Sequence, residues 1–352
     1  MEEKKKTARE IIEGYDGPPV RIMEVCGTHT HEIFRLGIRK LLPEHVELIS
    51  GPGCPVCVTQ VGFIDEAIYL ALERQVTICT FGDLVRVPGT NMSLAGAREK
   101  GAKIRIVYSP VDAKEYAKEH PKEQVTFLSV GFETTTPSAC LSVKKAREEG
   151  LTNYSILTAN KTMPQAYEAL KGSADIFLYP GHVNAITGTK LCEELAKEGV
   201  SGVVAGFTAK ELLTALAVAL ARFQEGRPFF VNCYPRVVTE NGSPQAQKLV
   251  EEMMEPCDSE WRGLGVIKGS GMRLQEEWSA FDARKKYKIP LIQGKANPAC
   301  RCGDVLQGKC KPSDCKVFGK VCTPQHPVGA CMVSGEGACS AYYMYGEAEK
   351  MK

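Results

Sequence analysis

The sequence contains no long apolar run and no marked excess of charge of either sign. Its longest apolar stretch, residues 212–220, is too short to cross a bilayer and predicts a buried helix. The charged N-terminus is not followed by the apolar segment of a secretory signal. Because 44 Lys and Arg residues face 42 Asp and Glu residues, the net charge of +2 gives no reason to expect nucleic acid or a membrane surface as the main partner. We therefore expect a cytoplasmic protein.

Cysteine, in contrast, is abundant, with fifteen residues in the chain. A disulfide framework is not expected in a reducing cytosol, so clustered cysteines predict metal ligands or catalytic thiols. Three lie in two short turns near the N-terminus, and seven lie between residues 300 and 339. The remaining five stand singly in apolar or mixed surroundings and are interpreted as small buried hydrophobes: Cys79, Cys140, Cys192, Cys233 and Cys257.

Short apolar or β-branched runs alternate with helical patterns through most of the chain, which predicts parallel sheets flanked by helices. The predicted strands are residues 20–25, 45–50, 76–81, 103–108, 125–130, 154–158, 176–179 and 200–205. A chain of 352 residues exceeds what one core usually serves. We predict an α/β fold in which two parallel-sheet βα domains, residues 1–120 and 121–288, face a shared cleft. A small irregular iron-sulfur domain, residues 289–352, follows them. Residues 261–287 have no clear pattern.

Four unusual motifs each follow a predicted strand: residues 26–31, 51–57, 131–136 and 180–183. Ligands of open α/β sheets gather at the carboxyl ends of the strands, so we expect the four motifs to share one cleft. Their threonines could equally serve as helix caps.

Cys54 and Cys57 form a CxxC pair at a turn that opens a helix. Free N–H groups and the helix dipole at such a place favour thiolate, which suits a reversible disulfide. The pair could instead be half of a zinc site. No second CxxC lies nearby in sequence, so we favour redox chemistry.

Cys26 is followed by His29 and His31, which predicts a metal ligand or a nucleophile with a helper imidazole. The alternative is that the histidines cap the helix and bond to backbone. Glu133 and His182 are candidates for orienting a ligand or for acid–base chemistry. A carboxylate or imidazole at a strand end can also be a cap or a solvated group.

The tail offers more thiols than one tetrahedral site needs, in a segment rich in Gly and Pro with little to bury. Their wide, irregular spacing favours an iron-sulfur cluster over a zinc ribbon. Spacing alone does not identify the four ligands. The candidates are Cys300, Cys302, Cys310, Cys315, Cys322, Cys331 and Cys339.

Several motifs, in this order, resemble the hydrogenase maturation factor HypD family over residues 21–343. They are Cys26-Gly-Thr-His-Thr-His, Gly51-Pro-Gly-Cys-Pro-Val-Cys57, Gly131-Phe-Glu-Thr-Thr, Pro180-Gly-His-Val and Cys322-Thr-Pro with Glu336-Gly-Ala-Cys339. The resemblance implies two α/β domains and a C-terminal 4Fe-4S domain. It also implies a scaffold that, with the small chaperone HypC, assembles the Fe(CN)2CO part of the NiFe hydrogenase site. HypE would deliver cyanide, and the hydrogenase large subunit would be served indirectly.

The resemblance also assigns roles to residues. Cys26 would bind the iron, with His29 beside it, and Cys54 and Cys57 would exchange electrons with the cluster. The family's cluster pattern, similar to that of ferredoxin:thioredoxin reductase, has 14, 6 and 16 intervening residues. Cys300, Cys315, Cys322 and Cys339 fit it, with Cys302 and Cys331 as rivals and Cys310 as a bystander. The alternatives are a thiol-disulfide oxidoreductase that reduces a protein partner through the CxxC pair, and a zinc-structured binding protein.

Overall fold

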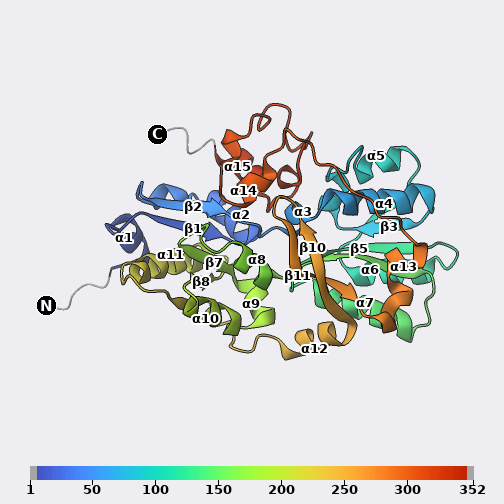
Figure 1. Ribbon diagram of the computed structural model, residues 1–352, viewed down its shortest axis with the longest axis horizontal. Coiled ribbons are helices and arrows are strands. Elements are labelled where there is room, and N and C mark those ends of the chain that lie inside the picture. Colours follow the sequence, from blue (N-terminus) through green and yellow to red (C-terminus); the bar gives the residue numbers. More distant parts are fainter. Residues whose placement is uncertain (1–5, 347–352) are drawn as a thin grey trace.

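A computed structural model describes residues 6–346 as two α/β lobes with a C-terminal segment packed above their junction (Figure 1). Each of the eight predicted runs contains a strand, and the strands within each lobe are parallel. The predicted α/β class, with parallel βα units and an irregular C-terminal region, is therefore confirmed. Within the described residues, no helix combines the length and the apolarity that crossing a membrane would require.

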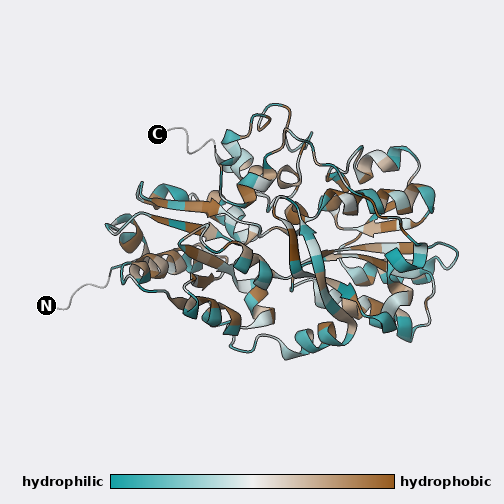
Figure 2. Cartoon of the chain, viewed as in Figure 1, coloured by the Kyte–Doolittle hydropathy of each residue, from teal (hydrophilic) through white to brown (hydrophobic). Residues whose placement is uncertain are grey.

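The first lobe is built on a five-stranded parallel sheet in the order β2-β1-β7-β8-β9. Its strands are β1 (Val20–Glu24), β2 (Val46–Ser50), β7 (Ile176–Pro180), β8 (Ser201–Ala205) and β9 (Phe230–Asn232). Its helices are α1 (Ala8–Glu13), α2 (Gly27–Arg35), α9 (Gly181–Thr187), α10 (Lys190–Lys197) and α11 (Ala209–Phe223), with the 3-10 turn η1 (Ile38–Leu41). The inner strands are apolar on both faces because helices cover both sides of the sheet (Figure 2).

The second lobe is built on a four-stranded parallel sheet in the order β4-β3-β5-β6. Its strands are β3 (Thr77–Thr80), β4 (Ile104–Ile106), β5 (Val125–Gly131) and β6 (Tyr154–Asn160). Its helical elements are α4 (Val61–Glu73), η2 (Gly82–Arg86), α5 (Leu94–Glu99), α6 (Pro110–Glu119), α7 (Thr136–Glu148) and α13 (Ala283–Tyr287). The short helices α3 (Pro55–Val58) and α8 (Met163–Ala169) lie where the chain passes between the lobes.

Strand pairing does not follow the boundary predicted near residue 120. The first sheet takes β1 and β2 from before that point and β7, β8 and β9 from after it, while the second sheet takes its four strands from both sides. Alternation of strands and helices predicts parallel pairing but not which strands become neighbours, because long crossovers permit either order. Residues 1–120 and 121–288 are therefore not the limits of the two sheets.

Residues 261–287, which have no clear pattern in sequence, belong mainly to an antiparallel ribbon at the centre of Figure 1. The ribbon pairs β10 (Met254–Trp261) with β11 (Gly265–Leu274), after α12 (Pro244–Met253) and before the 3-10 helix η3 (Glu276–Phe281). It touches both passages between lobes, because Thr59 bridges Trp261 and Lys161 bridges Gly271. Fully buried Lys161 reinforces this contact by donating to Ser259 Oγ over 2.6 Å.

The C-terminal segment has only short elements: α14 (Cys302–Leu306), η4 (Pro312–Asp314), η5 (Ala330–Met332) and α15 (Ala338–Tyr345). Helix α15 packs on α2 through Tyr342, whose ring meets Phe34 edge-on at 5.5 Å between centroids. Turn η5 packs on α3. The segment therefore covers the two cysteine-bearing turns at residues 26–31 and 51–57.

Candidate functional site

Cys26 lies where β1 ends and caps the N-terminus of α2. Its side chain is 1% exposed, and burial raises the pKa of the thiol to about 12. The N–H groups of Thr28 and His29 at the start of α2 partly oppose this rise in pKa, although the Cys26 side chain makes no capping hydrogen bond. The thiol is therefore held protonated, in a place already equipped to stabilise a thiolate once a cation arrives.

The turn at residues 51–57 is joined to the Cys26 turn by two backbone hydrogen bonds. Gly27 N donates to Gly53 O over 3.0 Å, and Gly51 N donates to Glu24 O over 2.9 Å. A Cβ at Gly53 would collide with the backbone of Cys26, so the close approach requires glycine. A Cβ at Gly27 would lie 3.2 Å from the Cβ of Cys54. The two motifs therefore form one unit, as the shared position at strand ends predicts.

Cys54 and Cys57 of the CxxC pair are buried and contact each other. Cys57 N donates to Cys54 Sγ over 3.3 Å, and the two side chains are 0% and 3% exposed, respectively. Burial raises the pKa of Cys57 well above its ordinary value, and the neighbouring thiols Cys331 and Cys54 add to the rise. The prediction that the helix start favours thiolate is therefore wrong for Cys57, since α3 is only four residues long and desolvation dominates.

His29 and His182 both pack against one aromatic ring, that of Phe207. The Phe207 ring centroid is 4.9 Å from that of His29 and 5.1 Å from that of His182. Desolvation lowers the pKa of His29 to about 3 and that of His182 to about 4, so both imidazoles are neutral. His29 Nε2 faces Gly206 O at 3.1 Å, which assigns it the proton. The lone pair of His29 Nδ1, buried without a partner, is then free to accept.

His31, in contrast, points to the C-terminal segment. Its Nδ1 faces Gly335 O at 3.0 Å, and its ring meets Tyr345 edge-on at 5.5 Å between centroids. Of the two histidines that follow Cys26, His29 therefore lies where β1, β7 and β8 end. His31 instead contacts the C-terminal segment that covers the site.

Glu133 follows β5 and is partly buried. Its Oε1 accepts a 2.8 Å hydrogen bond from Met163 N, whereas Oε2 has no partner. Burial raises the pKa of this carboxyl to about 7. Tyr167 Oη is also buried without a partner, and it lies close enough to Glu133 and Cys26 for negative charge on either to raise its pKa. Sequence reasoning missed Tyr167, because a tyrosine on an apolar helix face gives no functional signal.

Glu133→Gln is expected to alter the pH dependence of stability. The pKa rises from an ordinary 4.5 to about 7 on folding, so the stability that protonation of Glu133 contributes is complete below pH 4.5 and is lost as pH rises through 7. Glutamine mimics the protonated form at every pH. In urea unfolding between about pH 4.5 and 8, the wild type should lose about 3 kcal/mol relative to the variant. Parallel pH profiles would contradict this. Glu99→Gln, an exposed carboxylate, is the control.

Five thiols meet beneath the C-terminal segment. Cys331 is within hydrogen-bond reach of Cys57, Cys302 and Cys339, and Cys302 accepts from Cys300 over 3.2 Å. Interactions with Cys302, Cys339 and Cys57 lower the pKa of Cys331, whereas interactions with Cys302 and Cys331, and then burial, raise the pKa of Cys339. A continuous series of contacts between sulfurs therefore links Cys57 of the CxxC pair to Cys300 in the tail.

The predicted cluster ligands are only partly gathered around this group. Cys322 accepts from Val328 N over 3.4 Å and lies close enough to Cys300 and Cys302 for their charge to raise its pKa. Cys315 instead faces Ala299 O at 3.8 Å. Among residues 6–346, no three His, Cys, Asp or Glu side chains are arranged to hold a single metal ion. The donor set nevertheless fits an iron-sulfur cluster in kind, because the thiols are several, close in space and mostly buried.

Glu336 and Asp83 hold the covering loop in place, and neither was singled out from the sequence for a role. Thr28 Oγ1 donates to Glu336 Oε1 over 2.7 Å, and Ser334 Oγ donates to Asp83 Oδ2 over 2.8 Å. Glu336 lies close enough to Cys26 for its charge to raise the pKa of that thiol, which burial raises most. Each of the two hydrogen bonds joins residues more than 200 positions apart. No local pattern in the sequence could have paired them.

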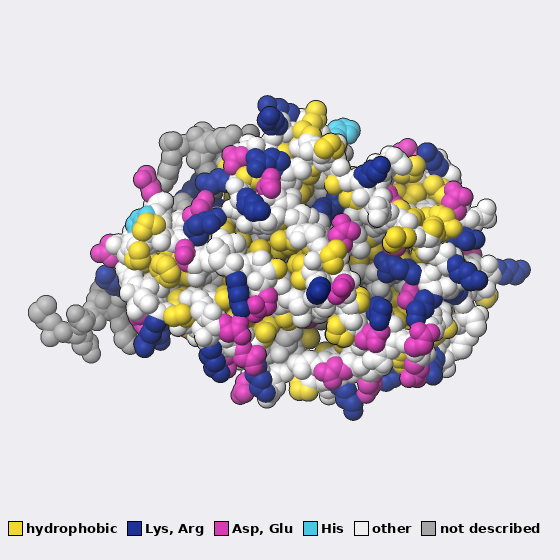
Figure 3. Space-filling view, viewed as in Figure 1, with side chains coloured by type: hydrophobic (Ala, Val, Ile, Leu, Met, Phe, Trp, Pro, Cys, Tyr) yellow, Lys and Arg dark blue, Asp and Glu magenta, His cyan; other side chains and the backbone are white. Residues whose placement is uncertain are grey.

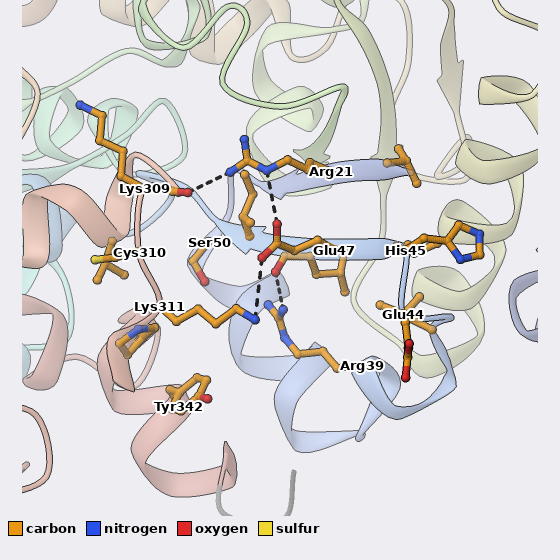
Figure 4. A pocket seen from close by; sticks show the side chains of 18 of the residues that line it. Arg21, Arg39, Glu44, His45, Glu47, Ser50, Lys309, Cys310, Lys311 and Tyr342 are labelled. Atoms are coloured by element: carbon orange, nitrogen blue, oxygen red, sulfur yellow. Dashed lines mark hydrogen bonds and ion pairs between the residues drawn. The ribbon is translucent and has the colours of Figure 1, made fainter. Parts of the chain in front are cut away.

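A separate pocket of about 1190 Å³ lies along the free edge of β2 (Figure 4). Its charges are largely paired, since Arg21 and Lys311 both reach Glu47, at 3.3 and 3.8 Å. Arg39 and Arg21 bond to backbone carbonyls, and Cys310 lines the wall. The contacts that line this pocket therefore hold the tail against the sheet. Among the described residues, Cys310 is the only cysteine that lines it.

Comparison with known proteins gives one consistent answer. The HypD family model, described as the hydrogenase formation hypA family, matches residues 2–346. The chain is 42% identical over 347 residues to the hydrogenase maturation factor HypD of Cupriavidus necator, covering 95% of this chain and 92% of the relative. It is 44% identical over 340 residues to HypD of Rhodobacter capsulatus (94% and 90%). It is 43% identical over 339 residues to HypD of Escherichia coli strain K12 (94% and 90%).

Proposed function

Since the chain belongs to the HypD family of hydrogenase maturation factors, we propose that it is a scaffold on which, with the small chaperone HypC, the Fe(CN)2CO centre of NiFe hydrogenase is assembled. HypE delivers cyanide in this proposal. The observation that carries it is Cys26, a buried thiol at the meeting point of two motif turns, near the unpartnered Tyr167 Oη. Such a place suits a small, ligand-carrying iron rather than a large organic substrate.

Iron is the substrate of this site, and Cys26 is its proposed ligand. Thiolate is a soft donor that suits low-spin Fe(II) carrying cyanide and carbonyl. The Cys26 proton, held by a pKa of about 12, leaves when iron binds, and the N–H groups at the start of α2 then stabilise the sulfur. His29 Nδ1 offers a neutral acceptor for a second contact, and Glu133, with a pKa of about 7, can hold or release a proton.

Cys54 and Cys57 supply redox capacity beside the iron ligand. Reducing their disulfide to two thiols takes two electrons and two protons. The thiols of Cys331 and Cys302 lie between this pair and Cys300 in one series of contacts. A 4Fe-4S cluster, held by Cys300, Cys315, Cys322 and Cys339, would supply electrons one at a time when bound. Cys302 and Cys331 remain the rival ligands.

A thiol-disulfide oxidoreductase acting on a protein partner is the second candidate. Such an enzyme presents its attacking sulfur to the partner's disulfide, because exchange requires direct contact between sulfurs. Here Cys54 is 3% exposed and Cys57 is fully buried. This burial favours electron exchange inside the molecule over attack on a protein substrate.

Infrared spectroscopy of the anaerobically purified chain, co-produced with HypC and HypE, tests the proposal. We expect bands of iron-bound cyanide and carbonyl that remain with the complex through purification. Rapid turnover of a disulfide-bonded protein by the chain alone, with no such bands, would favour the oxidoreductase. Zinc without iron or sulfide would favour a zinc-structured binding protein.

A further inference from the structure

Positive charge is concentrated in one part of the chain. Residues 283–335 contain ten Lys and Arg residues but only two acidic residues, Asp304 and Asp314. The rest of the chain has 34 basic and 40 acidic residues. The small net charge of the whole protein therefore hides a basic segment, and this segment carries six of the seven tail cysteines.

A pocket of about 930 Å³ opens between this segment and the lobe that carries α5. In Figure 3 the surface is hollowed between the top of the molecule and its right-hand lobe. Three cationic side chains line the pocket from three distant parts of the chain, namely Arg86, Arg262 and Lys295, whereas Glu99 is its only acidic residue. The wall is therefore electropositive.

The cations of this pocket are not neutralised by carboxylates. Among the described residues, none of the three takes part in an ion pair. Arg86 donates to Pro324 O over 2.6 Å and Arg262 Nε donates to Thr59 O over 2.9 Å, which fixes both guanidinium groups. Arg262 Nη2 is buried without a partner, and Lys295 is exposed.

The pocket wall also covers two of the proposed cluster ligands. Val328 lines the pocket, and its N–H donates to Cys322 Sγ over 3.4 Å. Pro298 lines it two residues before Cys300. Cys302 and burial raise the pKa of Cys300, and Arg262 lies close enough to this sulfur for its charge to oppose the rise in part. One layer of residues therefore separates the pocket from these sulfurs.

We propose that this pocket is the docking site of a small acidic electron-carrier protein. The inference rests on the proposed function, because the carrier's electrons go to the group held by the sulfurs beneath the wall. Each encounter oxidises one carrier by one electron. Two encounters, with two protons from solvent, reduce the Cys54–Cys57 disulfide to two thiols. Electrostatic steering suits such transient encounters, whose interfaces are small.

Stopped-flow mixing of the cluster-loaded chain with a reduced, acidic [2Fe-2S] ferredoxin tests the proposal. Lys295→Glu should lower the second-order rate constant about fivefold at low salt, and Glu99→Lys should raise it by a similar factor. Lys197→Glu, an exposed cation on α10 outside the pocket, is the matched control and should leave the rate constant unchanged. Calorimetry at low salt should give a ferredoxin Kd about fivefold higher for Lys295→Glu.

The experiment distinguishes failure of the docking site from failure of the proposed function. Equal rate constants and equal Kd values for wild type, Lys295→Glu and Glu99→Lys would overturn the docking site. Reduction by methyl viologen radical, a small reductant that needs no docking, reports the cluster itself. If that reductant bleaches no visible absorbance in the wild type, the proposed function fails instead.

Discussion

Alanine in place of Cys26 is expected to abolish retention of iron that carries cyanide and carbonyl. Cys26 is the proposed soft donor because it occupies the N-cap position of α2 at the junction of the two motif turns. Removing the proposed iron ligand should lower the infrared bands of the co-purified complex by more than about tenfold, because loss of even an outer-shell partner of a metal site commonly costs that much.

The control for this experiment is a cysteine that lies away from the site. Cys233→Ala removes a half-buried thiol just after β9 and should keep the bands at wild-type intensity. Circular dichroism and HypC binding establish that Cys26→Ala is folded. Full-intensity bands in a folded Cys26→Ala protein would contradict the assignment of Cys26 as the iron ligand.

The second large effect is expected from Cys322→Ala. An iron-sulfur cluster is held by four thiolates, and losing one usually leaves it unstable. Anaerobically purified wild type should contain about four irons and four sulfides per chain with a broad visible absorbance. The variant should lose most of both. Metal and sulfide analysis with an absorbance spectrum measures the change.

Cys310→Ala is the matched control for Cys322→Ala. Both residues lie in the tail, but Cys310 lines the pocket beside β2 and, although it lies near Cys315, it is not among the five thiols that meet at Cys331. It should keep iron, sulfide and absorbance unchanged. The same analysis of Cys302→Ala and Cys315→Ala decides the ligand set, because only a ligand's loss should release the cluster. Zinc in place of iron in the wild type would contradict the cluster.

The strands were predictable from sequence because the buried parallel strands are short runs rich in apolar and β-branched residues. Val125 to Gly131 and Tyr154 to Asn160 are buried at every position. The β10–β11 ribbon was not predictable, because it is largely exposed on one face and bears Pro256, Cys257 and several glycines. Its order comes from tertiary contacts such as the bridges of Thr59 to Trp261 and of Lys161 to Gly271.

The candidate site was predictable where residues follow strand ends, since Cys26, Cys54 and Glu133 each lie at such a point. The residues that reach the site from other parts of the fold were not predictable. Tyr167 and Glu336 reach the site through packing of α8 and of the covering loop, and no periodicity encodes that approach. The pairing of strands across residue 120 was not predictable for the same reason, because sheet neighbours are set by crossovers.

The interleaving of the two sheets also fixes an order of events during synthesis. Strand β1 pairs with β2 and with β7, so one edge of the first strand pair stays open until residues 176–180 leave the ribosome. At ordinary translation rates that wait is on the order of ten seconds. The second sheet needs only residues 77–160 and can form meanwhile. The Cys26 turn is thus among the first segments made and the last to be enclosed, which leaves its thiol open to oxidants and stray metals for longest.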